Sequence, residues 1–308
     1  MKEDRQDLST GSIWGKMLFF SFPLMLTNLL QVLFNMADIA VIGQFAGALS
    51  LGAVGSTTTL VTLFTGVLIG MAGGINVLVA RYFGARDKTS TVHTIHTALL
   101  VSLITGIIVL VFGMIFSKGI LEIMNTKEEL LNGAVLYIRI YFLGMPALAL
   151  YNFGNAVCSA FGDTKKPLYY LSAAGVVNVV LNLFFVIVCK MDVAGVATAS
   201  IISQYLSAFL ILRALAKMGG DYALRLSELK FDKRMAKYII QIGLPAGLQN
   251  GIFQLANLFI QAGVNTFDAT MVAGNSAAAN ADALLYDSMA AFYTACGSFM
   301  GQNYGAGK

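Results

Sequence analysis

The sequence predicts an all-α protein that crosses a membrane several times, and three observations support this fold class. Hydrophobic residues make up 57% of the 308-residue chain and charged residues only 12%, too few charges to cover a soluble surface of this size. Eight apolar stretches each reach the roughly 20 residues that a spanning helix needs. The order of residues around Pro23 also recurs around Pro245, at an offset of 222 positions, which is typical of folds built from two similar halves.

We expect one spanning helix for each apolar stretch. In chain order these are residues 16–43, 54–80, 94–116, 134–158, 167–189, 193–216, 237–266 and 274–301. The first is too long for a signal-peptide core and lacks a small-residue cleavage site, so we expect it to be retained. The fourth connection, Gly162 to Pro167, reads as a tight hairpin because Gly and Asp break the outgoing helix and Pro suits the first turn of the next.

The cations are distributed unevenly over the connections. Most of the 20 lysines and arginines lie at the N-terminus, in the even-numbered connections and at the C-terminal end, whereas the odd-numbered connections hold only Lys118, Lys127 and Lys190. By the positive-inside rule, both ends and the even connections are expected in the cytoplasm. The three cysteines are scattered and indicate neither a disulfide framework nor a zinc site.

The repeat suggests how the chain is organised. Arg81–Asp87 closes the first passage, and residues 302–308 close the second at an offset of 221 from Gly84 to Gly305. We expect an N-terminal lobe of six helices over 1–216, a basic cytoplasmic linker over 217–237, and the start of a second lobe over 238–308. The linker could instead form a helix on the lipid surface, but its apolar spacing is irregular. A second half that matched the first would need four more helices, so we expect a C-terminally truncated chain.

A polar stripe follows the first helix. Spacings of three, four and three place four side chains on one helical face, namely Asn28, Gln31, Asn35 and Asp38. An ionisable residue inside a bilayer costs roughly 2.5–3.5 kcal/mol on insertion scales and tends to face a bundle interior or a watery cavity. Asp38 is therefore the best single candidate for a functional residue. In the alternative interpretation Asp38 reaches interfacial water and the amides hold helices together.

Further polar residues lie in the other predicted helices. The seventh repeats the stripe without its acid, and the fourth, fifth, sixth and eighth add isolated polar groups: Asn250, Gln254, Asn257, Asn152, Asn155, Asn178, Asn182, Ser200 and Asp282. Neutral oxygens of this kind suit a weakly held Na⁺ or steady a protonatable carboxylate. Alone, they are also ordinary packing hydrogen bonds. Asp282 lies one turn from Tyr286, and we expect it rather than Asp287 to line a cavity.

At this point the residues resemble a known family. Several segments carry the likeness: the stripe ending at Asp38, Val79–Arg86, Tyr151–Gly154, Gly162–Leu168, Gly243–Gln249 and Gly301–Lys308. Their order and spacing over essentially the whole chain resemble multidrug and toxic compound extrusion (MATE) transporters of the MOP flippase superfamily. The resemblance implies twelve helices in two six-helix lobes around a cavity that opens alternately to each side. It also implies export of amphipathic, often cationic compounds in exchange for Na⁺ or H⁺, by a monomer in a bacterial-type plasma membrane.

The resemblance also implies a site for the coupling ion. Asp38 matches the acid that bacterial members use for cation coupling, and Asn178 matches an asparagine of the same site. Asn182 stands where some members carry a second acid, and Ser200 stands where they carry threonine. With one carboxylate in the N-terminal lobe instead of two, the choice between Na⁺ and H⁺ stays open.

Other functions fit the sequence less well. A flippase for lipid-linked sugars in the same superfamily would line its cavity with cations for pyrophosphate, and the predicted membrane interior offers Arg139 and little else. An enzyme would need a nucleophile, a base or a metal cluster within mutual reach, and no such motif occurs in the sequence. We therefore expect no enzyme, no cofactor beyond the coupling ion and no nucleic-acid partner. An inactive fragment of a transporter is a further alternative.

Overall fold

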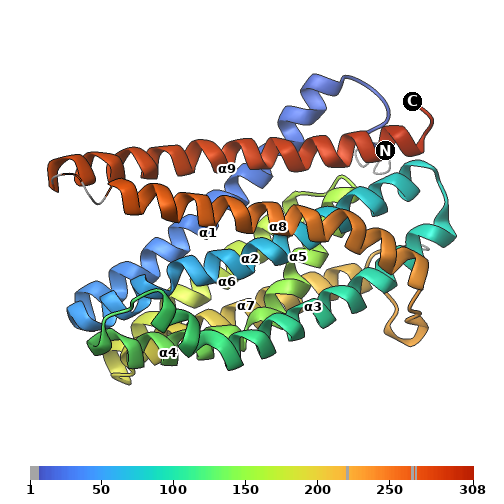
Figure 1. Ribbon diagram of the computed structural model, residues 1–308. Coiled ribbons are helices and arrows are strands. Elements are labelled where there is room, and N and C mark those ends of the chain that lie inside the picture. The colour runs from blue at the N-terminus through green and yellow to red at the C-terminus, as the bar shows by residue number, and fades with distance from the viewer. Residues whose placement is uncertain (1–6, 220–221, 265–266, 268) are drawn as a thin grey trace.

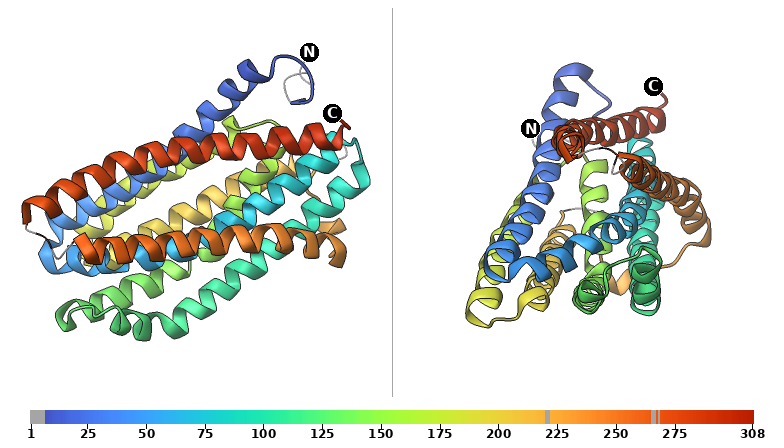
Figure 2. Two further views of the ribbon diagram at one scale, coloured as in Figure 1. Left: turned by 45° about the horizontal axis from the view of Figure 1, so that its top comes forward. Right: turned by 60° about the vertical axis from the view of Figure 1, so that its left-hand side comes forward.

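The computed structural model describes residues 7–219, 222–264, 267 and 269–308. In this part, nine α-helices form a bundle: α1 (Ile13–Phe45), α2 (Gly47–Gly84), α3 (Lys88–Ile123), α4 (Glu128–Phe142), α5 (Met145–Ala160), α6 (Lys165–Leu183), α7 (Asp192–Ala216), α8 (Lys233–Val264) and α9 (Ala269–Gly305). A π-helical turn, Phe184–Val188, extends α6, and Leu226–Glu228 form a short 3₁₀ turn. The long helices run side by side, and Lys308 lies at the same end of the bundle as the start of the described chain (Figures 1 and 2).

Each predicted apolar segment falls on these helices, and one of them is broken. The stretch predicted as one helix over 134–158 is divided into α4 and α5, which meet at an angle of 46°. Leu143 and Gly144 form the break, and the Tyr205 hydroxyl donates a 3.0 Å hydrogen bond to the Leu143 carbonyl. A hydrogen bond from another helix can satisfy a carbonyl that the break releases, which makes the bend tolerable inside a bundle.

Five helices are long and apolar enough to cross a membrane, judged by length and composition over the described residues: α1, α2, α3, α6 with its π-turn, and α7. They become six if α4 and α5 count as one bent span. The predicted seventh and eighth spans are present as the helices α8 and α9. Over their described residues, these two helices are less apolar than the five spans named above. The polar stripe of α8 and the many small and polar residues of α9 lower their mean hydropathy.

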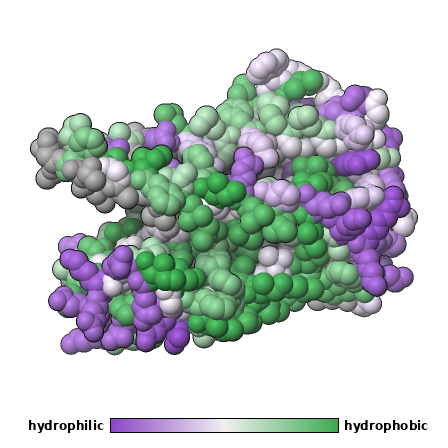
Figure 3. Space-filling view, in the orientation of Figure 1, coloured by the Kyte–Doolittle hydropathy of each residue, from purple (hydrophilic) through white to green (hydrophobic). Residues whose placement is uncertain are grey.

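The surface has the polarity that a membrane protein requires. Apolar side chains cover the middle of the face drawn in Figure 3, and hydrophilic ones gather at both ends. At the end away from Lys308, the same face is hollowed between the α8–α9 pair and the helices below it. Large apolar side chains such as Ile108, Ile115 and Val180 are exposed along the helices, which is favourable only in contact with lipid or another apolar surface.

Two helices connect the parts of the bundle. α2 packs against α3, α4 and α5 as well as α8 and α9, and α1 packs against α6 and α9. The segment before α8 rests on the start of α3, where the Asp232 backbone N–H donates to the Thr97 hydroxyl at 3.1 Å. In the described part of residues 217–232 the only regular element is the 3₁₀ turn, so these residues do not form a lipid-surface helix.

Candidate functional site

A buried carboxylate lies at the junction of α1, α6 and α7. Asp38, in the second half of α1, keeps only 8% of its surface exposed. One carboxylate oxygen accepts a short hydrogen bond from the Asn182 amide of α6, and the other accepts one from the Ser200 hydroxyl of α7 at 3.2 Å. The structure thus joins residues that are 144 and 162 positions apart in the sequence.

Asn178 closes this group into a ring. It lies one helical turn before Asn182, so both side chains project from the same face of α6. The Asn178 side-chain oxygen accepts from Asn182 at 3.2 Å, and its amide nitrogen donates to the Ser200 hydroxyl at 3.5 Å. All four side chains are buried. The four residues that the resemblance assigns to ion coupling therefore form one hydrogen-bonded cluster.

The chemistry of the cluster suits a small hard cation or a proton. Asn182 Oδ1 is buried without a hydrogen-bond partner, and it adds a free oxygen to those of Asp38, Asn178 and Ser200. Oxygen donors of this type favour hard cations. Among the described residues no lysine, arginine or histidine forms an ion pair with Asp38. An unpaired charge is costly in a dry interior, so the Asp38 carboxylate is stabilised there by a bound cation or by a proton.

The rest of the α1 stripe acts differently. The Asn28 amide donates to the Asp287 carbonyl of α9 at 3.0 Å, and the Asn250 amide of α8 donates to the Gly66 carbonyl of α2 at 3.3 Å. Asn35 is exposed and bonds to the carbonyl of Gln31 in its own helix. The structure thus contradicts the part of the alternative interpretation that placed Asp38 in interfacial water, because this carboxylate is buried. Within the stripe, Asn28 holds α1 to α9, and Asp38 belongs to a polar cluster.

The remaining predicted cavity residues do not join this cluster. Asn152 bonds to the Leu148 carbonyl of its own helix, and the buried Asn155 Oδ1 has no partner. On the second repeat, Gln254 is half-buried, whereas Asn257 and Asp282 are exposed. Their role in lining a cavity stays a prediction.

Two tyrosines near Asp38 were missed by the sequence reasoning. Tyr137 and Tyr141 of α4 stack with ring centroids 5.9 Å apart, and both lie near Asp38. Their spacing of four places both rings on one face. That spacing is visible in the sequence, but nothing in it indicates that this face turns toward α1.

Known proteins resemble this chain both in sequence and in fold. The MatE family model matches residues 23–184. The "Probable multidrug resistance protein YpnP" of Bacillus subtilis (strain 168) is 31% identical over 98% of this chain and 67% of its own length. The "Probable multidrug resistance protein YoeA" of the same organism is 26% identical over 87% of this chain and 59% of its own length. The chain thus spans about two thirds or less of these relatives.

A solved structure has the same arrangement of helices. It is described as the outward-facing conformation of a multidrug resistance MATE family transporter of the MOP superfamily, and it superposes with a TM-score of 0.89 at 24% identity. The match covers 97% of this chain and 66% of that one. At this identity the likeness concerns the fold alone.

Proposed function

The chain belongs to the MatE family of membrane transporters, and from that premise we propose that it serves in the export of amphipathic, often cationic compounds by alternating access. Transport is driven by exchange for Na⁺ or H⁺. The family is not one of enzymes, in agreement with the lack of a catalytic motif in the sequence. The names of YpnP and YoeA, which describe multidrug resistance, support this class of substrate.

One observation carries the proposal for the ion site. Asp38 is a lone buried carboxylate held by Asn182 and Ser200, with an unpartnered amide oxygen beside it. Binding and release of a cation there would change the charge inside the bundle of α1, α6 and α7. A change in charge biases helix packing only if the ion binds one arrangement better than the other. Coupling therefore requires that the surroundings of Asp38 differ between the two states.

The proposal includes an arrangement in lobes. Residues 1–216 form the N-terminal lobe, 217–237 the cytoplasmic linker, and 238–308 the first two helices of the second lobe, with the N-terminus in the cytoplasm of a bacterial-type cell. The repeat in the sequence supports this division, as does the packing of α8 and α9 against α2 and α1. In this arrangement α8 and α9 are spans seven and eight.

Efflux measurements on Asp38→Asn test the proposal. Cells expressing the protein are loaded with a panel of cationic dyes, and the Na⁺ and proton gradients are collapsed separately. We expect Asp38→Asn to abolish ion-driven efflux, because the amide has the same shape but carries no charge. Asp192→Asn is the matched control, since that carboxylate is exposed at the start of α7 and lies outside the cluster. Undiminished gradient-driven efflux by Asp38→Asn would overturn the assignment.

A further inference from the structure

An open pocket lies at the start of α8, beside the segment that leads into this helix. Its volume is about 440 Å³, and it is lined by two lysines, one glutamine and three apolar side chains: Phe231, Lys233, Ala236, Lys237, Ile240 and Gln241. Lys233 and Lys237 are about one helical turn apart, so both side chains lie on the same face of α8. Phe231 keeps 50% of its surface exposed, and Ile240 keeps 43%. The pocket therefore combines a pair of cations with an apolar wall.

The two lysines are free to bind an anion. Among the described residues, none forms a hydrogen bond or an ion pair with either ammonium group. The acid before them, Asp232, is engaged elsewhere, because its carboxylate accepts from the Arg234 and Met235 backbone N–H groups at 2.8 and 3.2 Å. The same carboxylate lies 3.9 Å from the His93 ring. The charge that the pocket offers to an anion therefore comes from its lysine side chains.

An apolar row continues from the pocket along α8. Ile240, Leu244 and Leu248 follow one another at spacings of four, which places them on one side of the helix. Their exposed fractions are 43%, 42% and 55%. From Lys237 to Leu248 the helix rises about 16 Å, and half of a hydrocarbon core of about 30 Å is about 15 Å. The row therefore has the length of an acyl chain in one leaflet.

The first repeat indicates that this face is left to lipid. The offset of 222 gives three residues of α8 their mates, the residues at equivalent positions of α1: Ile240, Gln241 and Leu244 pair with Leu18, Phe19 and Phe22. These mates are 57%, 66% and 61% exposed, although α1 packs against α2, α6, α7 and α9. A lysine lies against this face too, because the Lys165 ammonium is 4.7 Å from the centroid of the Phe19 ring. We expect the equivalent face of α8 to be exposed to lipid in the same way.

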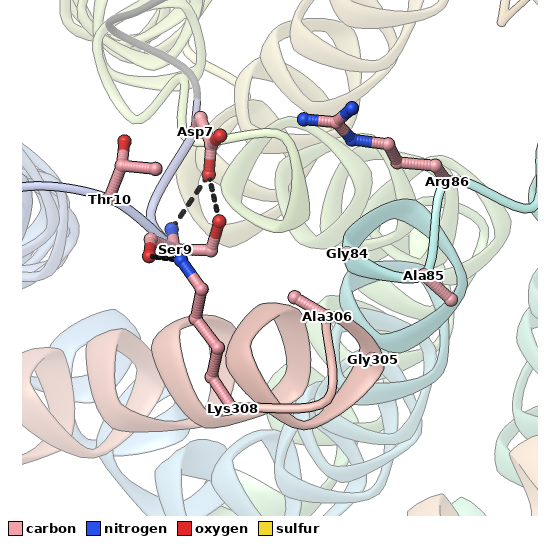
Figure 4. Close-up of a pocket in the computed structure, with 9 residues that line it drawn as sticks. All are labelled: Asp7, Ser9, Thr10, Gly84, Ala85, Arg86, Gly305, Ala306 and Lys308. Carbon is pink, nitrogen blue, oxygen red and sulfur yellow. Dashed lines mark hydrogen bonds between the residues drawn. The ribbon is translucent and has the colours of Figure 1, made fainter.

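A second pocket at this end of the bundle has a different character. It measures about 310 Å³ and lies between residues 7–10 and the ends of α2 and α9 (Figure 4). The Lys308 ammonium already donates to the Ser9 carbonyl at 2.7 Å, and Asp7 adds an acid. Among the residues that line it, none has an apolar side chain larger than that of alanine. This pocket thus lacks the free cation pair and the apolar wall found at the start of α8.

We propose that the pocket at the start of α8 binds one anionic phospholipid, with its phosphate on the Lys233 and Lys237 ammonium groups and an acyl chain along the apolar row. A molecule of this class matches both parts of the surface, the cation pair and the apolar face that follows it. Basic residues next to a membrane attract anionic lipids of the cytoplasmic leaflet, and the basic connections are expected on that side. The inference does not depend on which compounds the protein transports.

Fluorescence quenching by brominated lipids tests the site on the purified full chain in detergent. Leu244→Trp places a reporter on the apolar row, in a chain whose single tryptophan is removed by Trp14→Phe. Phosphatidylglycerol or phosphatidylcholine, brominated on the acyl chain, is then titrated. We expect phosphatidylglycerol to quench at a concentration at least about tenfold lower, because its phosphate carries a net charge that two lysines attract. Leu248→Trp repeats the measurement with a reporter one turn further along.

The site predicts which cations matter. Lys233→Gln with Lys237→Gln should reduce the preference for phosphatidylglycerol to about twofold or less. Arg234→Gln with Lys217→Gln is the matched control, because it removes the same charge from the same end of the bundle and neither residue lines the pocket. Arg234 Nε instead donates to the Tyr238 hydroxyl at 3.4 Å. The control should keep the preference, and an equal loss in both double variants would overturn the proposal in favour of a general attraction between charges.

Other occupants of this face give different results. If neither lipid quenches the tryptophan introduced by Leu244→Trp or Leu248→Trp, the apolar row is covered by protein and the proposal is wrong. If inorganic phosphate displaces phosphatidylglycerol at the same concentration as the lipid, the pocket is a site for soluble anions, and the acyl chain has no part in binding. Because binding is measured without transport, a chain that exports no dye but binds phosphatidylglycerol at this site would contradict only the proposed transport function.

Discussion

Asn182 is the neighbour on which the environment of Asp38 most depends. It donates to the carboxylate, bonds to Asn178, and carries the unpartnered oxygen of the cluster. Asn182→Ala removes all three features at once. A buried polar group that loses its partner typically costs about 1–3 kcal/mol, so we expect the Na⁺ or proton dependence of efflux to shift by about tenfold or more. Dye efflux measured over a series of ion concentrations checks this.

Asn35→Ala is the control for that measurement. Asn35 lies on the same stripe, but it is exposed and bonds only to the Gln31 carbonyl of its own helix. Its loss should leave the ion dependence unchanged. Equal shifts in the two variants would mean that the cluster has no special part in ion binding.

At the scale of elements, α3 offers two glycines with opposite surroundings. A Cβ at Gly113 would lie 2.4 Å from the ring of Phe142, which itself packs edge-on against Phe64, whereas a Cβ at Gly119 would meet nothing within 4 Å. We expect Gly113→Ala to destabilise the protein by about 1–3 kcal/mol through overpacking. Gly119→Ala should stabilise it by about 0.5–1 kcal/mol, because alanine is the better helix former. Thermal unfolding in detergent measures both, and equal effects of the two variants would refute this account of α3 packing.

The start of α3 predicts a pH effect. Asp87 caps the helix, and hydrogen bonds from the Ser90 hydroxyl and backbone N–H hold the pKa of the exposed Asp87 carboxyl below its ordinary value of 3.8. Because the folded pKa is lowered, the stabilisation is fully present above 3.8 and is lost as the pH falls through the folded value. We expect Asp87→Ala to cost about 1 kcal/mol at neutral pH.

Unfolding temperatures over a pH series check this prediction. The difference between the wild type and Asp87→Ala should shrink at acid pH, while Asp87→Asn should stay close to the wild type at neutral pH because asparagine caps helices equally well. A difference that does not change with pH would show that Asp87 stabilises α3 by some means other than its charge.

The elements also show what the sequence could and could not predict. The eight segments were predicted from continuous apolar runs. The break at Leu143 and Gly144 was not predicted, because a continuous apolar run contains no signal for a bend of 46°. Spacing placed Asp38 on a polar face, but its partners come from α6 and α7, and a single sequence does not reveal which faces meet. The Asn178 and Asn182 pair was visible as a pattern. The tyrosines of α4 were not distinguished, since only packing turns them toward α1.

At the scale of the whole molecule, the repeat predicts more than similar halves. Its mates meet at Ala80 and Gly301, while the mate of Asp38 is Ile260, which is exposed on α8. The fold is therefore symmetric where the two repeats touch and asymmetric where the charge lies. Because of this difference, an ion that binds at Asp38 alters the charge of the first repeat alone. The contact between the two repeats is made by equivalent residues of each.

The orientation of the whole bundle gives the last prediction. Cys189 is exposed in the connection between α6 and α7, one of the odd-numbered connections, which together hold only three lysines. Gly219 follows α7 in a basic connection, and a Cβ there would meet nothing within 4 Å. Since basic connections stay in the cytoplasm, an impermeant maleimide should label Cys189 in intact cells carrying Cys296→Ser. In the same background with Cys189→Ser, Gly219→Cys should react only after the membrane is permeabilised. The reverse pattern would invert the molecule, so that the hollow in the face drawn in Figure 3 would open toward the cytoplasm.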